Sequence, residues 1–281
     1  MTAALSTRST HRCFGGTQGF YSHASESTGT TMNFAVFVPP QAAHGPVPAL
    51  YYLAGLTCTE ETFVIKAGAQ RLAAELGLML IACDTSPRGL NLPGEADSWD
   101  FGLAAGFYLD ATEAPWAPHY RMGSYVNREL PALVEAHFPA RPDRRGLFGH
   151  SMGGHGALVS ALRHPGRWHS LSALAPIANP SAVPWGQKAF SRYLGANLAD
   201  WQAYDACELL RQATYPGHIL VDQGLSDQFL SQLQPDVLEA TAQQVGQSLQ
   251  LRRHAGYDHG YYFVQSVMAD HLHHHAATLL A

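Results

Sequence analysis

Two observations predict an α/β fold with a mostly parallel central sheet and helices on both faces. Short, continuous apolar runs alternate along the chain with segments of helical spacing, and such alternation builds parallel strands joined by helices. The 281 residues are 46% hydrophobic and only 14% charged, a composition that buries a large core. We expect a single domain over residues 1–281, because no internal repeat and no linker interrupts the pattern.

The N-terminal part of the chain is predicted to be rich in strands. Residues 1–10 are polar, and we expect them to be flexible. NFAVFVPP (33–40) alternates and stops at two prolines, which is typical of an edge strand. VPALYYLAG (47–55) and LMLIACD (78–84) are apolar runs that indicate strands buried on both faces. The segment 60–77 between them has helical spacing and a closing glycine, which predicts a helix.

The rest of the chain repeats the alternation of helix and strand around two irregular insertions, at about 85–118 and 179–200. The first is dense in glycine, proline and aromatic residues, and loops of that length are usually functional. We expect both insertions to lie over the active site at the carboxyl ends of the strands. Further strands are predicted at 145–150, 169–176, 216–224 and 248–256, and helices at 119–138, 153–165, 235–247 and 261–279.

Composition and charge exclude several classes of protein. The net charge is −5 and no block of basic residues occurs, so no nucleic-acid partner is expected. No run of 18 apolar residues and no apolar leader is present, which predicts a cytoplasmic protein without a membrane partner. Four cysteines are too widely spaced for a disulfide framework, and sixteen scattered histidines lack metal-ligand spacing, so neither a metal nor a cofactor is expected. The run His273–His275 is interpreted as a polar face of the last helix.

The pattern GHSMG, residues 149–153, lies between a predicted strand and a predicted helix. This context is typical of a nucleophile elbow, in which a serine occupies a strained turn and small residues are needed two positions before and after it. Gly149 and Gly153 meet that need. The pattern therefore predicts that Ser151 is a nucleophile, and the alternative is an ordinary serine in a glycine-rich turn.

A serine nucleophile requires a histidine base and an acid that orients the base, in the chain order serine, acid, histidine. His259 lies between the last predicted strand and the last helix, whereas His254 falls at the end of that strand. The acid is expected after the preceding strand, where Asp222 and Asp227 both occur. We prefer Asp227 because it lies in the loop, whereas Asp222 lies within the strand run.

The tetrahedral intermediate of acyl transfer needs two backbone N–H donors. Met152 follows the nucleophile and is predicted to supply one of them. Leu56 is predicted to supply the other, because Gly55 before it lets the backbone turn inward. His155, four residues after the serine, is expected to be a packed helix residue and not a catalytic group.

Several longer strings resemble the S-formylglutathione hydrolase, or esterase D, family. They span about residue 30 to the C-terminus and include GLTCTEE, SWDFG, GHSMGGHGAL, PWGQKAF, DQGLSDQFL and GYDHGYYF. The resemblance implies the α/β-hydrolase fold, a cytoplasmic homodimer, hydrolysis of S-formylglutathione to formate and glutathione in formaldehyde detoxification, and side activity on short-chain carboxylesters. It also implies the triad Ser151, Asp227 and His259 with the donors Leu56 and Met152. Cys58 resembles a family cysteine near the site, and we expect it not to be the nucleophile.

The expected substrate suggests further binding residues. A formyl group is small, so Trp185 and Phe229 are predicted to wall a tight acyl pocket, with ordinary core packing as the alternative. Glutathione carries two carboxylates, which favours cations at the rim, although each candidate has a solvated surface charge as its alternative. The candidate cations are Lys66, Arg88, Lys188 and Arg192.

Two other functions stay open at this point. The first is a general short-chain carboxylesterase or an acyltransferase on the same fold. The second belongs to another class, a catalytically inactive binding or scaffold protein.

Overall fold

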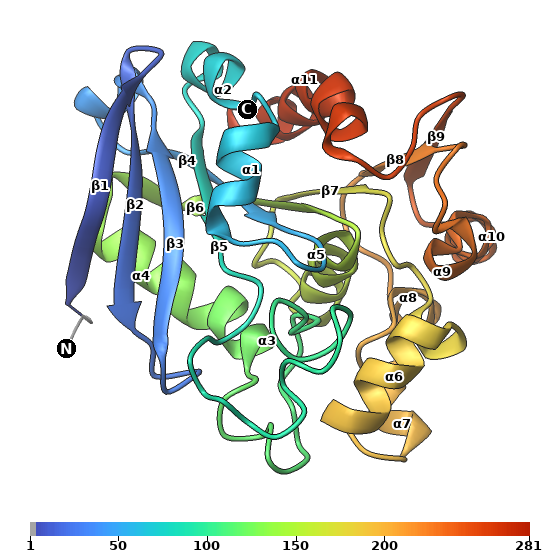
Figure 1. The fold of residues 1–281 in the computed structure, drawn as a ribbon. Coiled ribbons are helices and arrows are strands. Elements are labelled where there is room, and N and C mark those ends of the chain that lie inside the picture. Colours follow the sequence, from blue (N-terminus) through green and yellow to red (C-terminus); the bar gives the residue numbers. More distant parts are fainter. Residues whose placement is uncertain (1–3) are drawn as a thin grey trace.

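A nine-stranded sheet runs through the computed structural model, which describes residues 4–281 (Figure 1). The strands are β1 (Leu5–Cys13), β2 (Gly16–Ala24), β3 (Thr31–Val38), β4 (Val47–Leu53), β5 (Met79–Cys83), β6 (Ala140–His150), β7 (Ser170–Leu174), β8 (Ile219–Gly224) and β9 (Leu249–His254). Their order across the sheet is β1-β2-β3-β5-β4-β6-β7-β8-β9. The first three strands pair antiparallel, and the six from β5 to β9 are parallel to one another.

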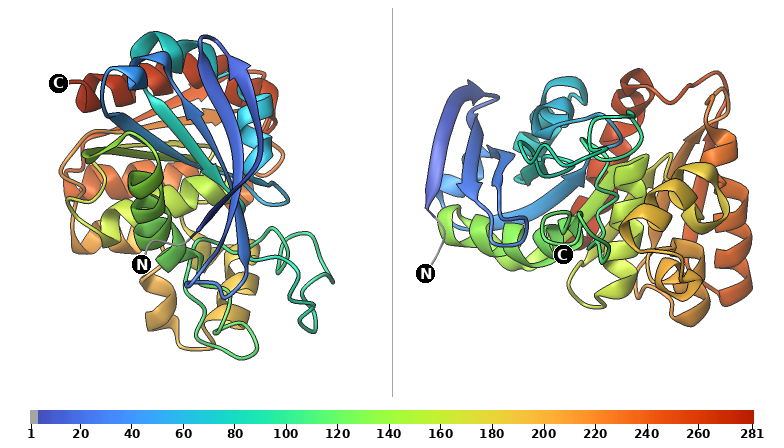
Figure 2. Two further views of the ribbon diagram at one scale, coloured as in Figure 1. Left: turned by 90° about the vertical axis from the view of Figure 1, so that its left-hand side faces the viewer. Right: turned by 60° about the horizontal axis from the view of Figure 1, so that its bottom comes forward.

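Helices cover both faces of the parallel part of the sheet. They are α1 (Glu60–Lys66), α2 (Gln70–Leu76), α3 (Met122–Ser124), α4 (Leu130–His137), α5 (Met152–Arg163), α6 (Pro184–Tyr193), α7 (Leu198–Gln202), α8 (Ala206–Gln212), α9 (Leu230–Leu233), α10 (Pro235–Val245) and α11 (Tyr261–Leu279). A π-helical turn, η2 (Tyr125–Glu129), joins α3 to α4, and 3-10 turns lie at Pro40–Ala43 (η1) and Pro180–Ala182 (η3). Helices α1, α2 and α11 lie on one face, and α4, α5, α8 and α10 on the other (Figures 1 and 2).

The strands in the middle of the sheet are covered from both sides, and every residue of β4, β5, β7 and β8 is buried. This explains why the sequences of β4 and β5 are continuous apolar runs and not alternating patterns, whereas β7 and β8 also carry polar residues at buried positions. The predicted α/β fold, with a mostly parallel sheet and helices on both faces, is confirmed.

The N-terminal segment is a strand and not a flexible tail. β1 pairs antiparallel with β2 along its length, and Arg8 forms an ion pair with Glu60 at 2.6 Å. Its side chains are mostly exposed because it is the edge of the sheet, so its hydrogen bonds hold it without an apolar pattern. The expectation of flexibility is therefore wrong for residues 5–10, and residues 1–3 lie outside the described part of the chain. β3 is not an edge strand either, since β2 covers its outer side.

Two segments differ from the sequence prediction in their helical content. The segment 60–77 forms two helices, because Gly68 adopts a φ of +65° and interrupts it. The segment 179–200 is not irregular, since it contains η3, α6 and the start of α7. The buried residues of α6 recur at helical spacing, but Pro184 and Gly186 are poor helix formers, and the sequence therefore did not indicate a helix there. Residues 85–118 form neither a helix nor a strand, as expected, and contain only isolated bridges.

The histidines of α11 are mostly turned toward the sheet. His275 is fully buried, and its two ring nitrogens lie 2.7 Å and 2.9 Å from the hydroxyls of Ser170 and Ser172 on β7. His271, also fully buried, lies 2.7 Å from Ser172. Only His273 of the run 273–275 is exposed, whereas His274 is half-buried and His275 is buried, so the interpretation of this run as a polar helix face is wrong. The reason is that serine hydroxyls on the sheet provide partners that the helix sequence does not reveal.

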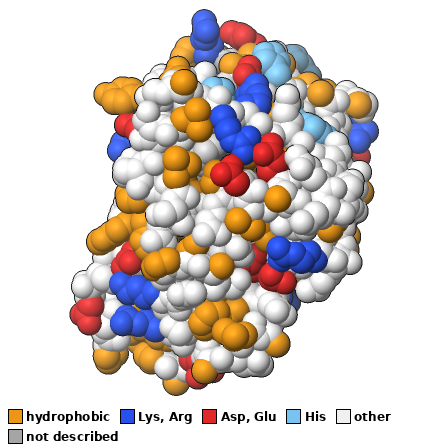
Figure 3. Space-filling view, turned by 90° about the vertical axis from the view of Figure 1, so that its right-hand side faces the viewer, with side chains coloured by type: hydrophobic (Ala, Val, Ile, Leu, Met, Phe, Trp, Pro, Cys, Tyr) orange, Lys and Arg blue, Asp and Glu red, His pale blue; other side chains and the backbone are white. Residues whose placement is uncertain are grey.

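The side of the molecule that carries α10 and β9 shows basic and acidic side chains in small neighbouring groups (Figure 3). Arg253 on β9, for example, pairs with Asp236 at 2.6 Å and with Glu239 at 2.7 Å. This face therefore does not present one sign of charge. Within residues 4–281, no helix combines the length and the apolar character needed to cross a bilayer.

Candidate active site

Ser151 occupies the tight turn between β6 and α5. Its φ is +59° and its ψ is −120°, a backbone conformation that is strained for a residue other than glycine. The Ser151 N–H donates to the Leu174 carbonyl on β7 at 2.9 Å, and the Ser151 carbonyl accepts from the Ile177 N–H at 3.3 Å. Backbone hydrogen bonds to the neighbouring strand thus hold the strained turn, as a nucleophile elbow requires.

The two glycines around Ser151 are required by the close approach of three backbone segments. A Cβ atom on Gly149 would lie 2.3 Å from the Gly153 carbonyl oxygen. A Cβ atom on Gly153 would lie 1.9 Å from the Leu53 carbonyl oxygen on β4. No side chain fits at such distances, so the small residues of the pattern allow β4, β6 and the first turn of α5 to meet.

Asp227 and His259 meet beside this turn, from loops that follow β8 and β9. The His259 Nδ1 atom lies 2.6 Å from the Asp227 Oδ2 atom. The Asp227 side chain is fully buried, and that of His259 is 12% exposed. The other carboxylate oxygen, Oδ1, accepts from the Phe229 N–H at 2.8 Å. The carboxylate can therefore orient the imidazole and stabilise its protonated form.

Asp222, the alternative acid, is bound in a different place. Its carboxylate is fully buried, accepts from Arg252 Nε at 2.6 Å, and lies 3.0 Å from both His254 and His271. Burial acts to raise the pKa of Asp222, but hydrogen bonds from His271 and Arg252 outweigh burial and hold that pKa well below its ordinary range. Asp222 thus joins β8, β9 and α11, and the rival base His254 is its partner.

Two further histidines lie close to Ser151 in the sequence. His150 is buried, its ring centroid is 4.5 Å from that of His259, and neither of its ring nitrogens has a hydrogen-bond partner within the described residues. Burial, and then the neighbouring His259, hold the pKa of His150 well below its ordinary value. His155 is fully buried against the Phe107 carbonyl at 3.1 Å, which agrees with a packing role. Sequence reasoning missed His150, because the position before the serine carries no requirement in the elbow pattern.

The two expected N–H donors lie on backbone segments next to Ser151. Met152 is the first residue of α5. A Cβ atom on Gly55 would lie 3.1 Å from Ser151 Cβ, so the loop that continues into Leu56 passes beside Ser151. The Thr57 N–H donates to the Ala104 carbonyl at 3.1 Å and anchors this loop to the first insertion.

Cys58 and Arg88 form part of the same loop structure. The Cys58 side chain is partly buried, and burial raises the pKa of its thiol, which therefore stays protonated at neutral pH. The Cys58 carbonyl accepts from Thr85 Oγ1 at 2.6 Å and from Arg88 Nη2 at 3.3 Å. Arg88 also forms an ion pair with Asp84 at 2.6 Å. Arg88 therefore stabilises the loop that carries Cys58, and its charge is already paired with Asp84.

An aromatic row leads from His259 to the surface. The Phe229 ring lies 5.1 Å from that of His259, Trp185 lies 4.9 Å from Phe229, and Trp99 lies 5.5 Å from Trp185. Trp185 belongs to α6 and Trp99 to the loop 85–118, so the two insertions meet beside the histidine. Trp185 is 8% exposed and Trp99 is 53% exposed. The predicted wall residues Trp185 and Phe229 are thus neighbours of each other, and Phe229 also contacts His259.

The remaining candidate cations have different surroundings. Lys188 pairs with Asp100 and donates to Ser98 at 2.9 Å, which ties α6 to the first insertion. The Arg192 guanidinium lies over an aromatic ring of that insertion at 4.7 Å. Lys66 is exposed at the end of α1, with its Nζ atom 5.8 Å from the ring centre of Tyr261.

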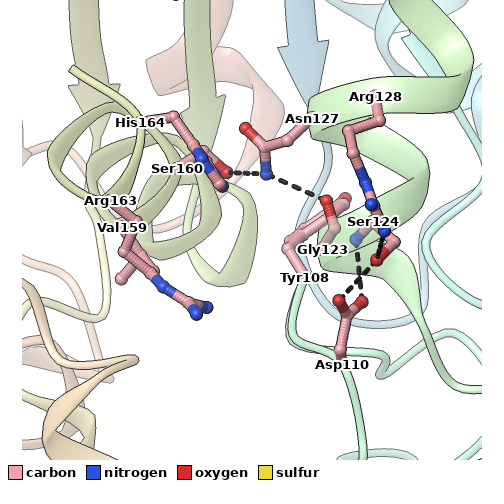
Figure 4. Close-up of a pocket in the computed structure, with 10 residues that line it drawn as sticks. All are labelled: Tyr108, Asp110, Gly123, Ser124, Asn127, Arg128, Val159, Ser160, Arg163 and His164. Carbon is pink, nitrogen blue, oxygen red and sulfur yellow. Dashed lines mark hydrogen bonds between the residues drawn. The ribbon is translucent and has the colours of Figure 1, made fainter.

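Away from Ser151, a separate cavity of 180 Å³ lies at the far end of α5 (Figure 4). Its polar groups bind one another: Asn127 donates to Ser160 at 3.0 Å, and both Arg128 and the Asp110 carboxylate lie 2.6 Å from the Ser124 hydroxyl. The length of α5 separates this cavity from Ser151, so it is not part of the candidate site. Among residues 4–281, no group of three or more His, Cys, Asp and Glu side chains is placed to hold a metal ion.

Comparisons with known proteins agree on one family. The Esterase family model matches residues 25–274. S-formylglutathione hydrolases of Paracoccus denitrificans and Mus musculus are each 53% identical to this chain, over 99% of it and 100% of their own length. The solved S-formylglutathione hydrolase from Agrobacterium tumefaciens is 49% identical over 97% of this chain and 99% of that one, with a TM-score of 0.95. The fluorophosphonate-binding serine hydrolase F of Staphylococcus aureus shares the fold, with a TM-score of 0.72 at 20% identity over 93% of this chain and 98% of that one.

Proposed function

The chain belongs to the S-formylglutathione hydrolase family of esterases, and from this membership we propose that it hydrolyses S-formylglutathione to formate and glutathione. The hydrolysis serves formaldehyde detoxification, and short-chain carboxylesters are side substrates. The observation that carries the proposal is the Asp227–His259 pair, 2.6 Å apart, beside the strained turn of Ser151. These positions at one end of the sheet support the roles of nucleophile for Ser151, base for His259 and orienting acid for Asp227.

In the first step, His259 takes the proton of the Ser151 hydroxyl while Oγ attacks the thioester carbonyl carbon. The N–H groups of Leu56 and Met152 stabilise the oxyanion that forms. The C–S bond then breaks, the glutathione sulfur takes the proton from His259, and a formyl ester remains on Ser151. Asp227 stays ionised throughout and stabilises the imidazolium.

In the second step, His259 takes a proton from water, and the resulting hydroxide attacks the formyl ester. The oxyanion is stabilised by the same two N–H groups, and its collapse returns the proton to Ser151 and releases formate. The step needs no group from outside the chain other than water. We therefore assign no metal or cofactor to the reaction.

The surroundings of the triad suggest how the substrate is held. Phe229, in contact with His259, and its neighbour Trp185 limit the space for the acyl group, which favours formyl over bulkier groups. Arg88 is ion-paired within the chain, which leaves the exposed Lys66 as the better candidate for a glutathione carboxylate. Cys58 lies in the loop that continues from Leu56 and acts as a neighbour of the site and not as its nucleophile.

Two wider features complete the proposal. A cytoplasmic location fits the four unpaired cysteines of the described chain. A homodimer is proposed from the family resemblance alone, and light scattering of the purified protein measures it directly.

The decisive experiment is hydrolysis of S-formylglutathione by the purified protein, beside p-nitrophenyl acetate and the Ser151→Ala variant. We expect thioester hydrolysis with the higher kcat/KM, and no hydrolysis of either substrate by Ser151→Ala. A higher kcat/KM for simple esters would indicate a general carboxylesterase. Failure of a fluorophosphonate probe to label Ser151 in a folded, inactive protein would indicate a binding or scaffold protein.

A further inference from the structure

Gln223, near the end of β8, donates to the same Asp227 oxygen that faces His259. Its Nε2 atom lies 3.0 Å from Asp227 Oδ2, and the side chain is fully buried. The Asp227 carboxylate therefore has three partners: the Gln223 amide and His259 on Oδ2, and the Phe229 N–H on Oδ1. Partners on both oxygens fix the plane of the carboxylate.

Hydrogen bonding fixes the direction of the Gln223 amide as well. The Nε2 group has two protons, and its second acceptor is the Gly224 carbonyl at 3.0 Å. A flipped amide would place its oxygen against the Asp227 carboxylate and the Gly224 carbonyl, three acceptors with no proton between them. Only the orientation that donates to Asp227 is therefore compatible with this environment.

The two ends of the Gln223 amide differ in their surroundings. Nε2 has two acceptors within the chain, Asp227 Oδ2 and the Gly224 carbonyl. Oε1 has no hydrogen-bond partner within the described residues. The amide is therefore bound to the rest of the chain through its donor end.

We propose that Gln223 is a positioning residue of the triad, holding the Asp227 carboxylate in the plane that faces His259. The inference rests on the proposed roles of Asp227 and His259. The amide also draws electron density from the shared Oδ2 atom, which weakens the hold of the carboxylate on the His259 proton. Without the amide, the carboxylate can rotate about its Cβ–Cγ bond, and it retains the imidazole proton more strongly.

The first test is Gln223→Met, which keeps the length of the side chain and removes the donor. Gln223 lines a cavity of 360 Å³ beside Leu230 and Pro235, which gives a replacement side chain room to adjust. We expect kcat for p-nitrophenyl acetate to fall about tenfold with little change in KM. The acidic limb of the kcat/KM profile should move to higher pH by roughly half a unit, because His259 must lose its proton before it can act as a base.

The second test is Gln223→Glu, which keeps the shape of the side chain and makes the donor depend on pH. The new carboxyl can donate to Asp227 while it is protonated, and it repels Asp227 once it ionises. The ratio of variant to parent kcat/KM should therefore fall as the pH rises. This variant decides the question if Gln223→Met does not fold.

The matched control is Gln247→Met. Gln247 is also buried, but its amide binds Gly217, Ser248 and Tyr215 near the opposite ends of β8 and β9. We expect it to lower Tm without moving the pH profile. An unmoved limb and a kcat within about twofold of the parent in Gln223→Met, or a ratio independent of pH in Gln223→Glu, would overturn the inference. Because these assays use an ester, a protein that fails to cleave S-formylglutathione would refute the proposed substrate and leave this test intact.

Discussion

Exchanging each of the two aspartates near the end of β8 for asparagine separates the proposed acid of the triad from a structural ion. In Asp227→Asn, the new amide group presents a donor or a weaker acceptor to His259 Nδ1 in place of the carboxylate at 2.6 Å. The imidazole then favours the tautomer that cannot accept the Ser151 proton, and its charged form loses its stabiliser. In enzymes with this triad the same exchange lowers kcat about 10⁴-fold, and we expect a loss of that order here.

Asp222→Asn should have the opposite effect and lower the stability of the protein while its activity is retained. The exchange leaves the Arg252 guanidinium without its buried partner, and breaking a buried ion pair costs about 3–5 kcal/mol. Arg252 is 28% exposed and also pairs with Asp270 at 2.8 Å. The loss of unfolding free energy should therefore be near the lower end of this range, about 3 kcal/mol. For a chain of 281 residues this corresponds to a fall in Tm of roughly 5 °C.

The assay is kcat/KM for p-nitrophenyl acetate, corrected for the folded fraction, together with Tm by circular dichroism. Asp227→Asn should lose activity with a small change in Tm, and Asp222→Asn should lose Tm with activity retained. A greater loss of activity in Asp222→Asn than in Asp227→Asn would refute the assignment of the acid.

Three further predictions follow from single positions. Gly153→Ala should destabilise the protein by more than about 3 kcal/mol in urea unfolding, because its Cβ would lie 1.9 Å from the Leu53 carbonyl oxygen; an unchanged midpoint would contradict the packing described for the turn. Burial lowers the pKa of His155 from its ordinary 6.5 to about 4, so the stability that it contributes is present above pH 6.5 and is lost as the pH falls toward 4. About 2 kcal/mol should be lost between pH 7 and pH 5, and His155→Gln should show a shallower fall in unfolding free energy, whereas equal slopes would argue against a neutral buried imidazole. Cys58→Ala should keep kcat/KM for p-nitrophenyl acetate within about threefold of the parent, and a loss of about 100-fold would implicate the protonated thiol in the chemistry.

The parts of the fold that the sequence predicted are those with a local signal. The buried strands β4 and β5 are continuous apolar runs, and the elbow around Ser151 needs small residues within two positions of it. The choice of Asp227 and His259 followed from their position in loops after strands, and the structure places these two side chains 2.6 Å apart.

The parts that the sequence did not reveal depend on partners far along the chain. β1 lacks an apolar pattern because its hydrogen bonds to β2 hold it at the edge of the sheet. The histidines of α11 resemble a polar face until Ser170 and Ser172 are placed opposite them. The position of His150 and the role inferred for Gln223 depend in the same way on contacts with His259 and Asp227. For Gln223 the sequence carries one signal, a polar residue at the carboxyl end of a buried strand.

The buried carboxylate of Asp222 bears on the order in which the elements around the candidate site assemble during folding. It is satisfied only when Arg252 on β9 and His271 on α11 have both docked, and the loop that carries His259 lies between those two elements. The serine turn, by contrast, depends on β4, β6, β7 and α5. During refolding from denaturant, hydrolysis should therefore reappear later than the far-ultraviolet signal of the early helices and strands, which makes catalysis a time-resolved reporter for the docking of residues 249–279.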